Sequence, residues 1–145
     1  MNIIITGTSG DIGRAIAEKF LREGHRVYGF DLNESVLSYP GYTHYVIDIR
    51  EAELPEIPGA EILINNAGTF EEADAIDINL RGTIRFTEKF IGSESLRSVL
   101  FIASASARNG AEFPYYVASK AGIVGYMKNL AVNLPKQGRN VTVKE

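Results

Sequence analysis

Tyr116 and Lys120 have the residue types and the spacing to move a proton. They lie in the run PYYVASKAG, where a helix is predicted, and residues four positions apart on a helix share one face. A tyrosine hydroxyl ordinarily has a pKa of about 10, and a nearby ammonium group favours its ionised form. The two residues therefore form a candidate acid–base pair. The neighbouring Tyr115 has the neutral Ser119 four positions on, so it lacks such a partner.

A glycine-rich run near the N-terminus, TGTSGDIGRAI (residues 6–16), could bind an anion. It joins a strand-like run to a helix-like run, and only in this context does a glycine-rich motif indicate nucleotide binding. Gly7 permits a tight turn, Gly10 or its neighbours let the backbone approach a pyrophosphate, and Gly13 lets the helix pack closely. The N–H groups and partial positive charge of the helix N-terminus favour a phosphate. The run predicts a dinucleotide cradle, and a plain strand–turn–helix with an aspartate cap is the alternative.

Two aspartates bear on the choice of cofactor. Asp11 lies inside the glycine-rich run, where an aspartate at the helix N-cap or in the first turn can face outward while the backbone faces the phosphates. Asp31 ends the strand-like run RVYGFD, about 20 residues past the loop, where a carboxylate accepts ribose hydroxyls and repels a 2′-phosphate. No basic residue lies within residues 7–13. These features predict NAD(H) rather than NADP(H).

Composition excludes several other classes of function. The 145 residues are 45% hydrophobic and 23% charged, with a net charge of −3, so nucleic acid is not an expected partner. No apolar run is long enough for a bilayer, and no secretory signal is evident at the start, so we expect no membrane partner and a cytoplasmic location. The chain has no cysteine, and His25 and His44 lie in turn-like or strand-edge positions, so no metal site is expected.

Alternating strand-like and helix-like runs predict the elements that position these residues. Short apolar runs, interpreted as strands, lie at residues 2–6, 27–30, 45–47, 62–64, 99–103 and 141–143. Helical spacing covers residues 12–21, 74–91 and 116–134, with the last helix ending before Pro135. Strands that are apolar throughout favour a parallel sheet covered on both faces. We therefore predict an α/β fold, a doubly wound parallel sheet in one domain spanning residues 1–145. Residues 32–59 are broken by prolines and glycines, so their crossovers should be loops or single turns.

Several motifs follow one another in an order that resembles the short-chain dehydrogenases/reductases, a Rossmann-type family. They are TGTSGDIG, VIDI, INNAG, DINLRGT, FIASAS and YVASK, and together they span the whole chain. The resemblance implies that Asp48 contacts the adenine. It further implies a cofactor site formed by Gly7, Ser9, Gly10, Asp11, Ile12, Gly13, Asp31, Leu32, Asp48, Ile49, Asn65, Asn66, Ala67, Gly68, Tyr116 and Lys120.

The same resemblance assigns four catalytic roles. Tyr116 would exchange a proton with the substrate, and Lys120 would assist it and bind the nicotinamide ribose. Ser104 would hydrogen-bond the carbonyl oxygen, although it could be an ordinary strand-end serine, with Ser106 as its competitor. Asn79 would support a water in the proton relay, or it could merely pack or cap a helix. The implied activity is NAD(H)-dependent interconversion of a secondary alcohol and a ketone, with a small carbonyl or alcohol substrate.

Two departures from the family pattern keep alternatives open. The loop spacing TGxxGxxG is more like the extended branch, which includes nucleotide-sugar epimerases, than the TGxxxGxG of ordinary members. The NNAG and YVASK segments resemble the ordinary branch, so we interpret the chain as an ordinary-type member with an atypical loop. Family chains continue past the NVTV strand into a substrate-covering loop, whereas this sequence stops at Glu145 and lacks that segment. Either the sequence is a fragment, or a partner or an unusual assembly completes the site. A non-catalytic, redox-sensing NAD-binding module and an epimerase- or dehydratase-like member are therefore the alternatives.

Assembly into a homodimer or homotetramer is also expected. Family members commonly pair through the helices that follow the fourth and fifth strands, here residues 74–91 and 116–134. The second helix carries more apolar side chains than one sheet face needs, namely Ile123, Tyr126, Met127, Leu130 and Leu134.

Overall fold

The first strand shows why its sequence is apolar at every position. The computed structural model, which describes residues 1–51 and 53–145, places β1 (Asn2–Thr6) in the middle of a six-stranded sheet. Ile3 and Ile5 pack into one apolar layer, whereas Ile4 packs into the layer on the opposite face. Because successive side chains of a strand point to opposite faces, a strand covered on both sides must be apolar throughout.

All neighbouring strands of the sheet run parallel. The others are β2 (Arg26–Asp31), β3 (Tyr42–Val46), β4 (Ala60–Asn65), β5 (Ser98–Phe101) and β6 (Thr142–Lys144), in the spatial order β3-β2-β1-β4-β5-β6. The predicted doubly wound parallel sheet is thus confirmed. The chain leaves β1 toward one edge and later returns to place β4 on its other side. The carboxyl ends of β1 and β4 therefore meet at the switch point where such sheets bind ligands.

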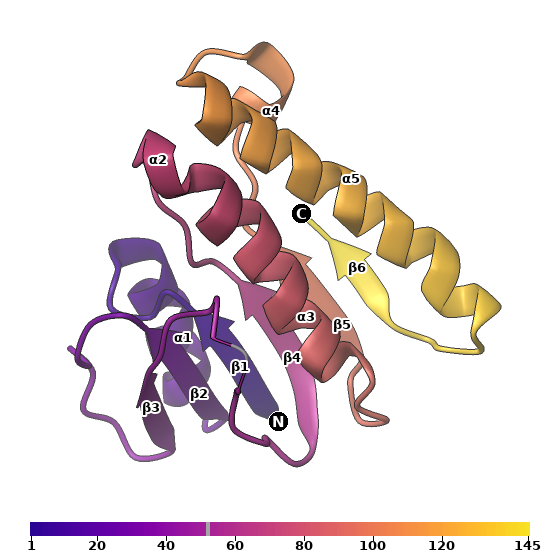
Figure 1. Ribbon diagram of the computed structural model, residues 1–145. Coiled ribbons are helices and arrows are strands. Elements are labelled where there is room, and N and C mark those ends of the chain that lie inside the picture. The colour runs from indigo at the N-terminus through magenta and orange to yellow at the C-terminus, as the bar shows by residue number, and fades with distance from the viewer. Residues whose placement is uncertain (52) are drawn as a thin grey trace.

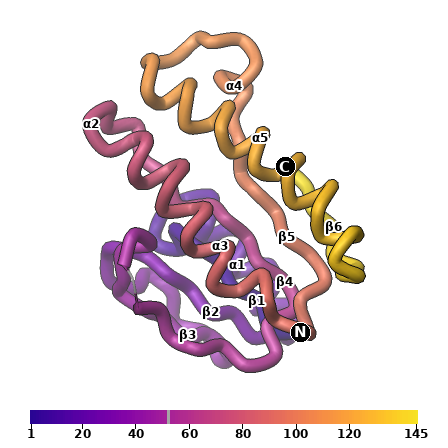
Figure 2. Tube along the Cα trace, turned by 45° about the vertical axis from the view of Figure 1, so that its right-hand side comes forward, coloured from indigo at the N-terminus to yellow at the C-terminus, as the bar shows by residue number. Residues whose placement is uncertain are grey.

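Helices cover both faces of this sheet. Helix α1 (Asp11–Arg22) lies behind the sheet in Figure 1, where Ala17 and Leu21 join the layer of Ile3 and Ile5. In front lie α5 (Pro114–Lys136) and a second helical run, and Figure 2 shows these two helical rods side by side. The second run consists of α2 (Glu72–Ala75), the π-helix η1 (Ile76–Gly82) and α3 (Thr83–Ile91). Among the described residues, no helix combines the length and apolar character needed to cross a membrane.

Several predicted boundaries are wrong in detail. Strand β3 begins at Tyr42, three residues before the predicted start, because it pairs with β2 from Val27 onward. Helix α5 continues through Pro135, since a proline in the final turn removes one N–H while Gln137 and Arg139 still donate to the Leu134 carbonyl. The short helix α4 (Ser106–Asn109) was not anticipated.

The irregular crossovers between β2 and β4 were anticipated. The described part of residues 32–59 contains no helix, as the prolines and glycines of this segment predicted, and Ala52 lies outside the described residues.

The apolar side chains of α5 pack mainly against the core of this chain. Ile123, Leu130 and Leu134 are buried in the core, and Tyr126 and Met127 are half-buried against it. The expectation that these five residues form surplus apolar surface for pairing is therefore wrong. The sheet face and η1 together use them, because α5 also packs along η1.

Candidate active site

The glycine-rich loop after β1 is shaped by two close backbone approaches. Gly7 has a φ of +76°, a conformation that favours glycine, and its N–H donates to the Phe30 carbonyl at 2.7 Å. A Cβ on Gly13 would lie 2.1 Å from the Gly7 carbonyl oxygen, so only glycine lets α1 begin this close to the loop. The loop conformation thus depends on Gly7 and Gly13, as the motif predicted. Gly10 is the N-cap of α1, and a Cβ there would have ordinary contacts.

The carboxylate of Asp11 points away from the loop. Asp11 is in the first turn of α1, its side chain is 99% exposed, and its nearest basic group is Arg14 at 3.6 Å. A negative charge here interacts favourably with the helix dipole. The full exposure of this side chain agrees with its expected outward orientation.

The loop after β4 is fastened to the glycine-rich loop. The Thr6 hydroxyl oxygen accepts hydrogen bonds from the backbone N–H groups of Asn66 (3.0 Å) and Ala67 (2.9 Å). The Asn66 side-chain amide donates to the Gly7 carbonyl at 3.2 Å. Asn65 instead points away from the cavity into the core, where its amide donates to the Thr87 hydroxyl at 3.0 Å.

Asp31 closes the other side of the glycine-rich loop. One carboxylate oxygen accepts the Ser9 backbone N–H at 2.9 Å, and the other accepts the Asn33 N–H at 2.9 Å. The Asn33 side-chain amide adds a third hydrogen bond to this carboxylate at 3.3 Å. A carboxylate offers about four acceptor sites, so the Asp31 carboxylate is fixed in place and keeps capacity for one further donor.

Asp48 follows β3 and is paired with Arg50. The guanidinium lies 2.6 Å from the Asp48 carboxylate and 3.5 Å from Asp74. Hydrogen bonding to Arg50 lowers the pKa of Asp48, against a smaller opposing effect of burial. Asp48 is therefore held in its charged form.

These residues surround one cavity of about 560 Å³ at the switch point, within the usual size range of ligand sites. Of the predicted cofactor residues, the cavity is lined by Gly7, Ser9, Gly10, Asp11, Ile12, Asp31, Leu32, Asp48, Ile49, Asn66, Ala67 and Gly68. Gly13, Asn65, Tyr116 and Lys120 do not line it. The sequence reasoning missed Phe30, Asn33, Ile47, Phe70 and Ile78, although all but Ile78 lie within two residues of predicted ones.

Lys120 lies behind the wall of this cavity. Its ammonium donates to the Ile102 carbonyl at 3.1 Å and is 5.8 Å from the centre of the Tyr116 ring. A Cβ on Gly68 would lie 3.4 Å from Nζ, so the lysine is packed beneath a residue of the cavity wall. The side chain is 7% exposed, and burial lowers the pKa of Lys120.

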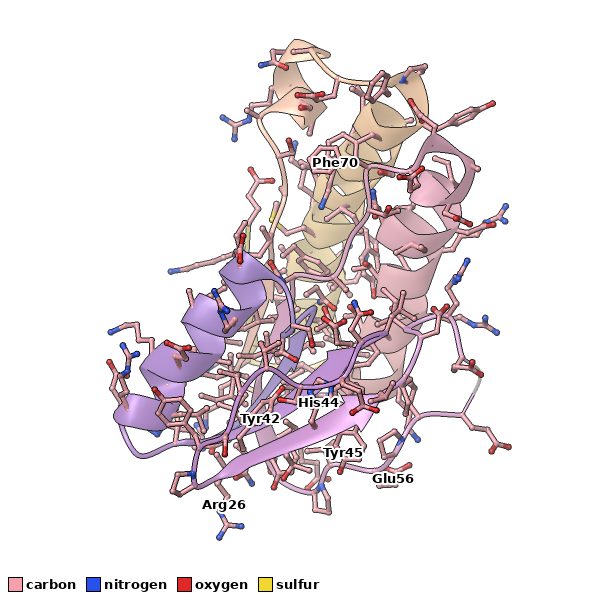
Figure 3. All side chains as sticks on the ribbon, turned by 90° about the vertical axis from the view of Figure 1, so that its left-hand side faces the viewer. Arg26, Tyr42, His44, Tyr45, Glu56 and Phe70 are labelled. Atoms are coloured by element: carbon pink, nitrogen blue, oxygen red, sulfur yellow. The ribbon has the colours of Figure 1, made fainter. Side chains whose placement is uncertain are left out.

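Tyr116 is buried, whereas Tyr115 is exposed. The Tyr116 ring stacks on Phe70, with ring centres 4.5 Å apart and an interplanar angle of 20°. Phe70 is itself 63% exposed and lines the cavity, and Figure 3 shows it beside the first turns of α5. Tyr115 faces solvent, and its N–H donates to the Glu72 carboxylate at 2.9 Å. The helix face predicted from the spacing of Tyr116 and Lys120 therefore points inward.

Asn79 occupies the middle of the π-helical segment η1. Its side chain accepts the Thr69 N–H at 2.7 Å, donates to the Thr69 carbonyl at 2.9 Å, and donates to the Ser119 hydroxyl at 3.1 Å. Wide helical turns of this kind often occur at functional sites. Asn79 is almost fully buried and ties the loop after β4 to α5, one residue from Lys120.

Ser104 lines a second cavity, which none of the other predicted site residues lines. This second cavity, of about 600 Å³, is bordered by the loop after β5, by α4 and by Glu145. The Ser104 hydroxyl oxygen accepts the Ser106 N–H at 3.2 Å, which secures the start of α4. Ser104 is half-buried at the cavity, whereas Ser106 is buried. Neither Tyr116 nor Lys120 is among the described residues that line this cavity.

The described residues contain no cluster of three or more histidine, cysteine, aspartate or glutamate side chains placed to hold a metal ion.

Comparisons with known proteins identify the family. Residues 46–145 match the short chain dehydrogenase family model. The rat dehydrogenase/reductase SDR family member 6 is 30% identical over 94% of this chain and 66% of its own length. The chain spans about two thirds of the length of such curated relatives.

Solved structures give the same answer. A 4-hydroxyisoleucine dehydrogenase complexed with NADH and succinate superimposes with a TM-score of 0.79 at 26% identity, over 97% of this chain and 76% of that one. The ligand-free aldohexose dehydrogenase of Thermoplasma acidophilum gives 0.76 at 26% identity, over 91% of this chain and 60% of its own. This chain therefore belongs to the short-chain dehydrogenase/reductase family of oxidoreductases.

Proposed function

We propose that the chain binds NAD(H) and supports the interconversion of a secondary alcohol and a ketone. The observation that carries the proposal is the cavity at the switch point. Its wall combines the N-terminus of α1 with the anchored carboxylate of Asp31. A similar structure was solved with NADH, which agrees with this choice of cofactor.

The residues present fit a nicotinamide dinucleotide. The backbone of the glycine-rich loop, with the first turn of α1, would hold the pyrophosphate. Asp31 would accept the ribose hydroxyls, and Asp48 would face the adenine. The bound cofactor supplies or takes the hydride. Asp31 also disfavours a 2′-phosphate, because two anions would meet at a site that offers no basic residue between Gly7 and Gly13.

The proton would be handled by α5. Tyr116 would give the proton to the substrate oxygen or take it away, and Lys120 would assist with its positive charge and would bind the nicotinamide ribose. Ser104 would hydrogen-bond the substrate oxygen as charge develops. Asn79 would hold the loop after β4 against the start of α5, because it hydrogen-bonds both Thr69 and Ser119.

Titration with both reduced cofactors, followed by their fluorescence, tests the cofactor half of this proposal. We expect NADH to bind at least tenfold more tightly than NADPH, the equivalent of about 1.4 kcal/mol. Equal affinities, or a preference for NADPH, would overturn it.

A non-catalytic NAD-binding module is the second candidate, and one feature of the site favours it. Phe70 covers the Tyr116 ring, and Ser104 lines a separate cavity. NADH binding without turnover on a panel of small ketones would support this alternative. The epimerase-like alternative rests only on the spacing of the glycine-rich loop.

We further propose that the chain forms a homodimer or homotetramer through α3 and α5. After burial of its core residues, α5 still exposes Tyr115 and Val132, at 58% and 56%. Light scattering at working concentration should show at least twice the mass of one chain. A monomer would count against this assembly.

A further inference from the structure

Strand β3, at the edge of the sheet, contacts the glycine-rich loop through Tyr42. The Tyr42 hydroxyl lies 2.9 Å from the hydroxyl of Thr8, which is almost fully buried in that loop. A Cβ on Gly29 of β2 would lie 2.2 Å from the Tyr42 hydroxyl oxygen and 2.6 Å from the Thr8 hydroxyl oxygen. The contact thus exists only because β2 has a glycine beneath it.

His44 continues this contact to the turn after β2, and Figure 3 shows Tyr42 and His44 together on β3. His44 Nδ1 lies 2.7 Å from the Tyr42 hydroxyl, and Nε2 lies 2.9 Å from the Asn33 carbonyl oxygen. Because a carbonyl can only accept, Nε2 carries a hydrogen and donates it. Burial raises the pKa of Tyr42, so its hydroxyl keeps a hydrogen that neutral Nδ1 can accept.

The glycine-rich loop and the turn after β2, which Tyr42 and His44 contact, both hydrogen-bond the carboxylate of Asp31. One Asp31 oxygen accepts the N–H of Ser9, next to Thr8, and the other accepts the N–H of Asn33. The Ser9 hydroxyl also donates to the Glu34 carbonyl at 2.9 Å. Tyr42 therefore contacts Thr8 on one side of this carboxylate, and His44 contacts Asn33 on the other side. Neither Tyr42 nor His44 lines the cavity.

We infer that His44, supported by Tyr42, is a positioning residue for Asp31, and that β3 thereby sets the discrimination against a 2′-phosphate. The inference rests on the proposed function, because it assigns the ribose to Asp31. Neither side chain is among the described residues that line the cavity. Both act through Asn33 and Thr8, so their effect should be on selectivity more than on affinity alone.

The test compares the ratio of NADPH to NADH dissociation constants in the 145-residue chain and its variants. In His44→Ala the Asn33 carbonyl loses its shorter hydrogen bond and keeps only the longer one from the Ser9 hydroxyl, at 3.4 Å. Asp31 then gains freedom, so the ratio should fall about threefold to tenfold, as expected for one hydrogen bond. His44→Gln should keep a ratio near that of the wild type, because its amide nitrogen can reach the same carbonyl. Thr43→Ala is the matched control on β3, with an exposed side chain on the opposite face.

A merely structural role would weaken both cofactors equally, leave the ratio unchanged and show no rescue by glutamine. That result, with the wild type preferring NADH, overturns this inference alone. A wild-type chain without a preference for NADH overturns the proposed function and this inference with it. If His44→Ala does not fold, Tyr42→Phe carries the test, because it removes only the hydroxyl. Its ratio should fall about twofold to threefold, and an unchanged ratio overturns the inference.

Discussion

The two halves of the sheet hold their site residues in different ways. Around β1, β2 and β3, the cavity wall is made of backbone and short side chains that hydrogen-bond one another, as in the contacts of Asp31 with Ser9 and Asn33. Around β4, β5 and β6, the candidate catalytic groups are longer side chains from separate elements. Tyr116 stacks under Phe70, and Ser104 faces another cavity. The wall of the first half is thus held together by its own hydrogen bonds, whereas the candidate catalytic groups of the second half are placed by separate elements.

This difference follows from the origin of the contacts. Glycine positions and a strand-end carboxylate fix a loop locally, so a preorganised binding site can be built from neighbouring residues. Tyr116 and Ser104 instead contact, respectively, the loop after β4 and the segment that contains α4. Such loops carry function and vary most in conformation. The predictions below test whether the two halves really differ in this way.

The largest expected effect is in the catalytic half. If Tyr116 transfers the proton, Tyr116→Phe should lower turnover by about 10² to 10⁴, measured on a panel of small ketones with NADH. NADH affinity should stay within about twofold, because the glycine-rich loop and Asp31 are untouched. Tyr115→Phe is the matched control, since Tyr115 is exposed. An inactive Tyr115→Phe beside an active Tyr116→Phe would show that the assignment is wrong by one residue.

The next largest effect is expected in the half of the sheet around β1, β2 and β3, called the preorganised half here because its cavity wall is held by its own hydrogen bonds. Asp31→Ala should reduce the preference for NADH over NADPH about tenfold, because it removes both the ribose acceptor and the repulsion of a 2′-phosphate. Asp11→Ala is the matched control on the same wall, since its fully exposed carboxylate points outward. Binding of both cofactors by each variant is measured by fluorescence. A larger change in Asp11→Ala than in Asp31→Ala would contradict the geometry of the loop.

Most of the preorganised half could be predicted from the sequence, and the reason is physical. Gly7 and Gly13 are required by a positive φ and a close backbone approach, and these needs are local. The identity of the inward helix face followed from the spacing of Tyr116 and Lys120. The stacking of Phe70 on Tyr116 could not be predicted, because it joins two elements across 46 positions with no periodic signal. The surplus apolar surface assigned to α5 was wrong, since a helical pattern does not show how many neighbours will cover it.

A smaller effect is expected where the two halves meet, at Lys120. Burial lowers the pKa of this lysine, so the folded state binds its proton less firmly than the unfolded state does. The charge therefore costs stability at neutral pH, and this cost disappears as the pH rises toward the ordinary value of about 10.4. Lys120→Met should raise the free energy of unfolding at pH 7 by about 1 kcal/mol while weakening NADH binding.

Urea unfolding of the wild type and of Lys120→Met, at pH 7 and at pH 9.5, measures this difference in the free energy of unfolding. The advantage of the methionine variant should shrink at the higher pH. Lys128→Met, an exposed lysine on the same helix, is the control and should change stability by less than about 0.5 kcal/mol. A loss of stability in Lys120→Met at pH 7 would show that the contact with the Ile102 carbonyl outweighs the burial of the charge.

The smallest effect belongs to the ion pair at the rim of the preorganised half. Arg50 lowers the pKa of Asp48, so the pair stabilises the fold above the ordinary carboxyl pKa of about 3.9, and this stabilisation is lost as the pH falls through the lowered value. Because the Arg50 side chain is 40% exposed, we expect Arg50→Ala to cost only about 0.5 kcal/mol at pH 7. The cost should shrink as the pH falls below about 3.9. Arg81→Ala, which breaks a more exposed pair with Asp77, should cost less. If urea unfolding gives the same cost for Arg50→Ala at pH 7 and pH 3, the guanidinium acts through its packing and its other neighbours, and Asp48 does not depend on it for its charge.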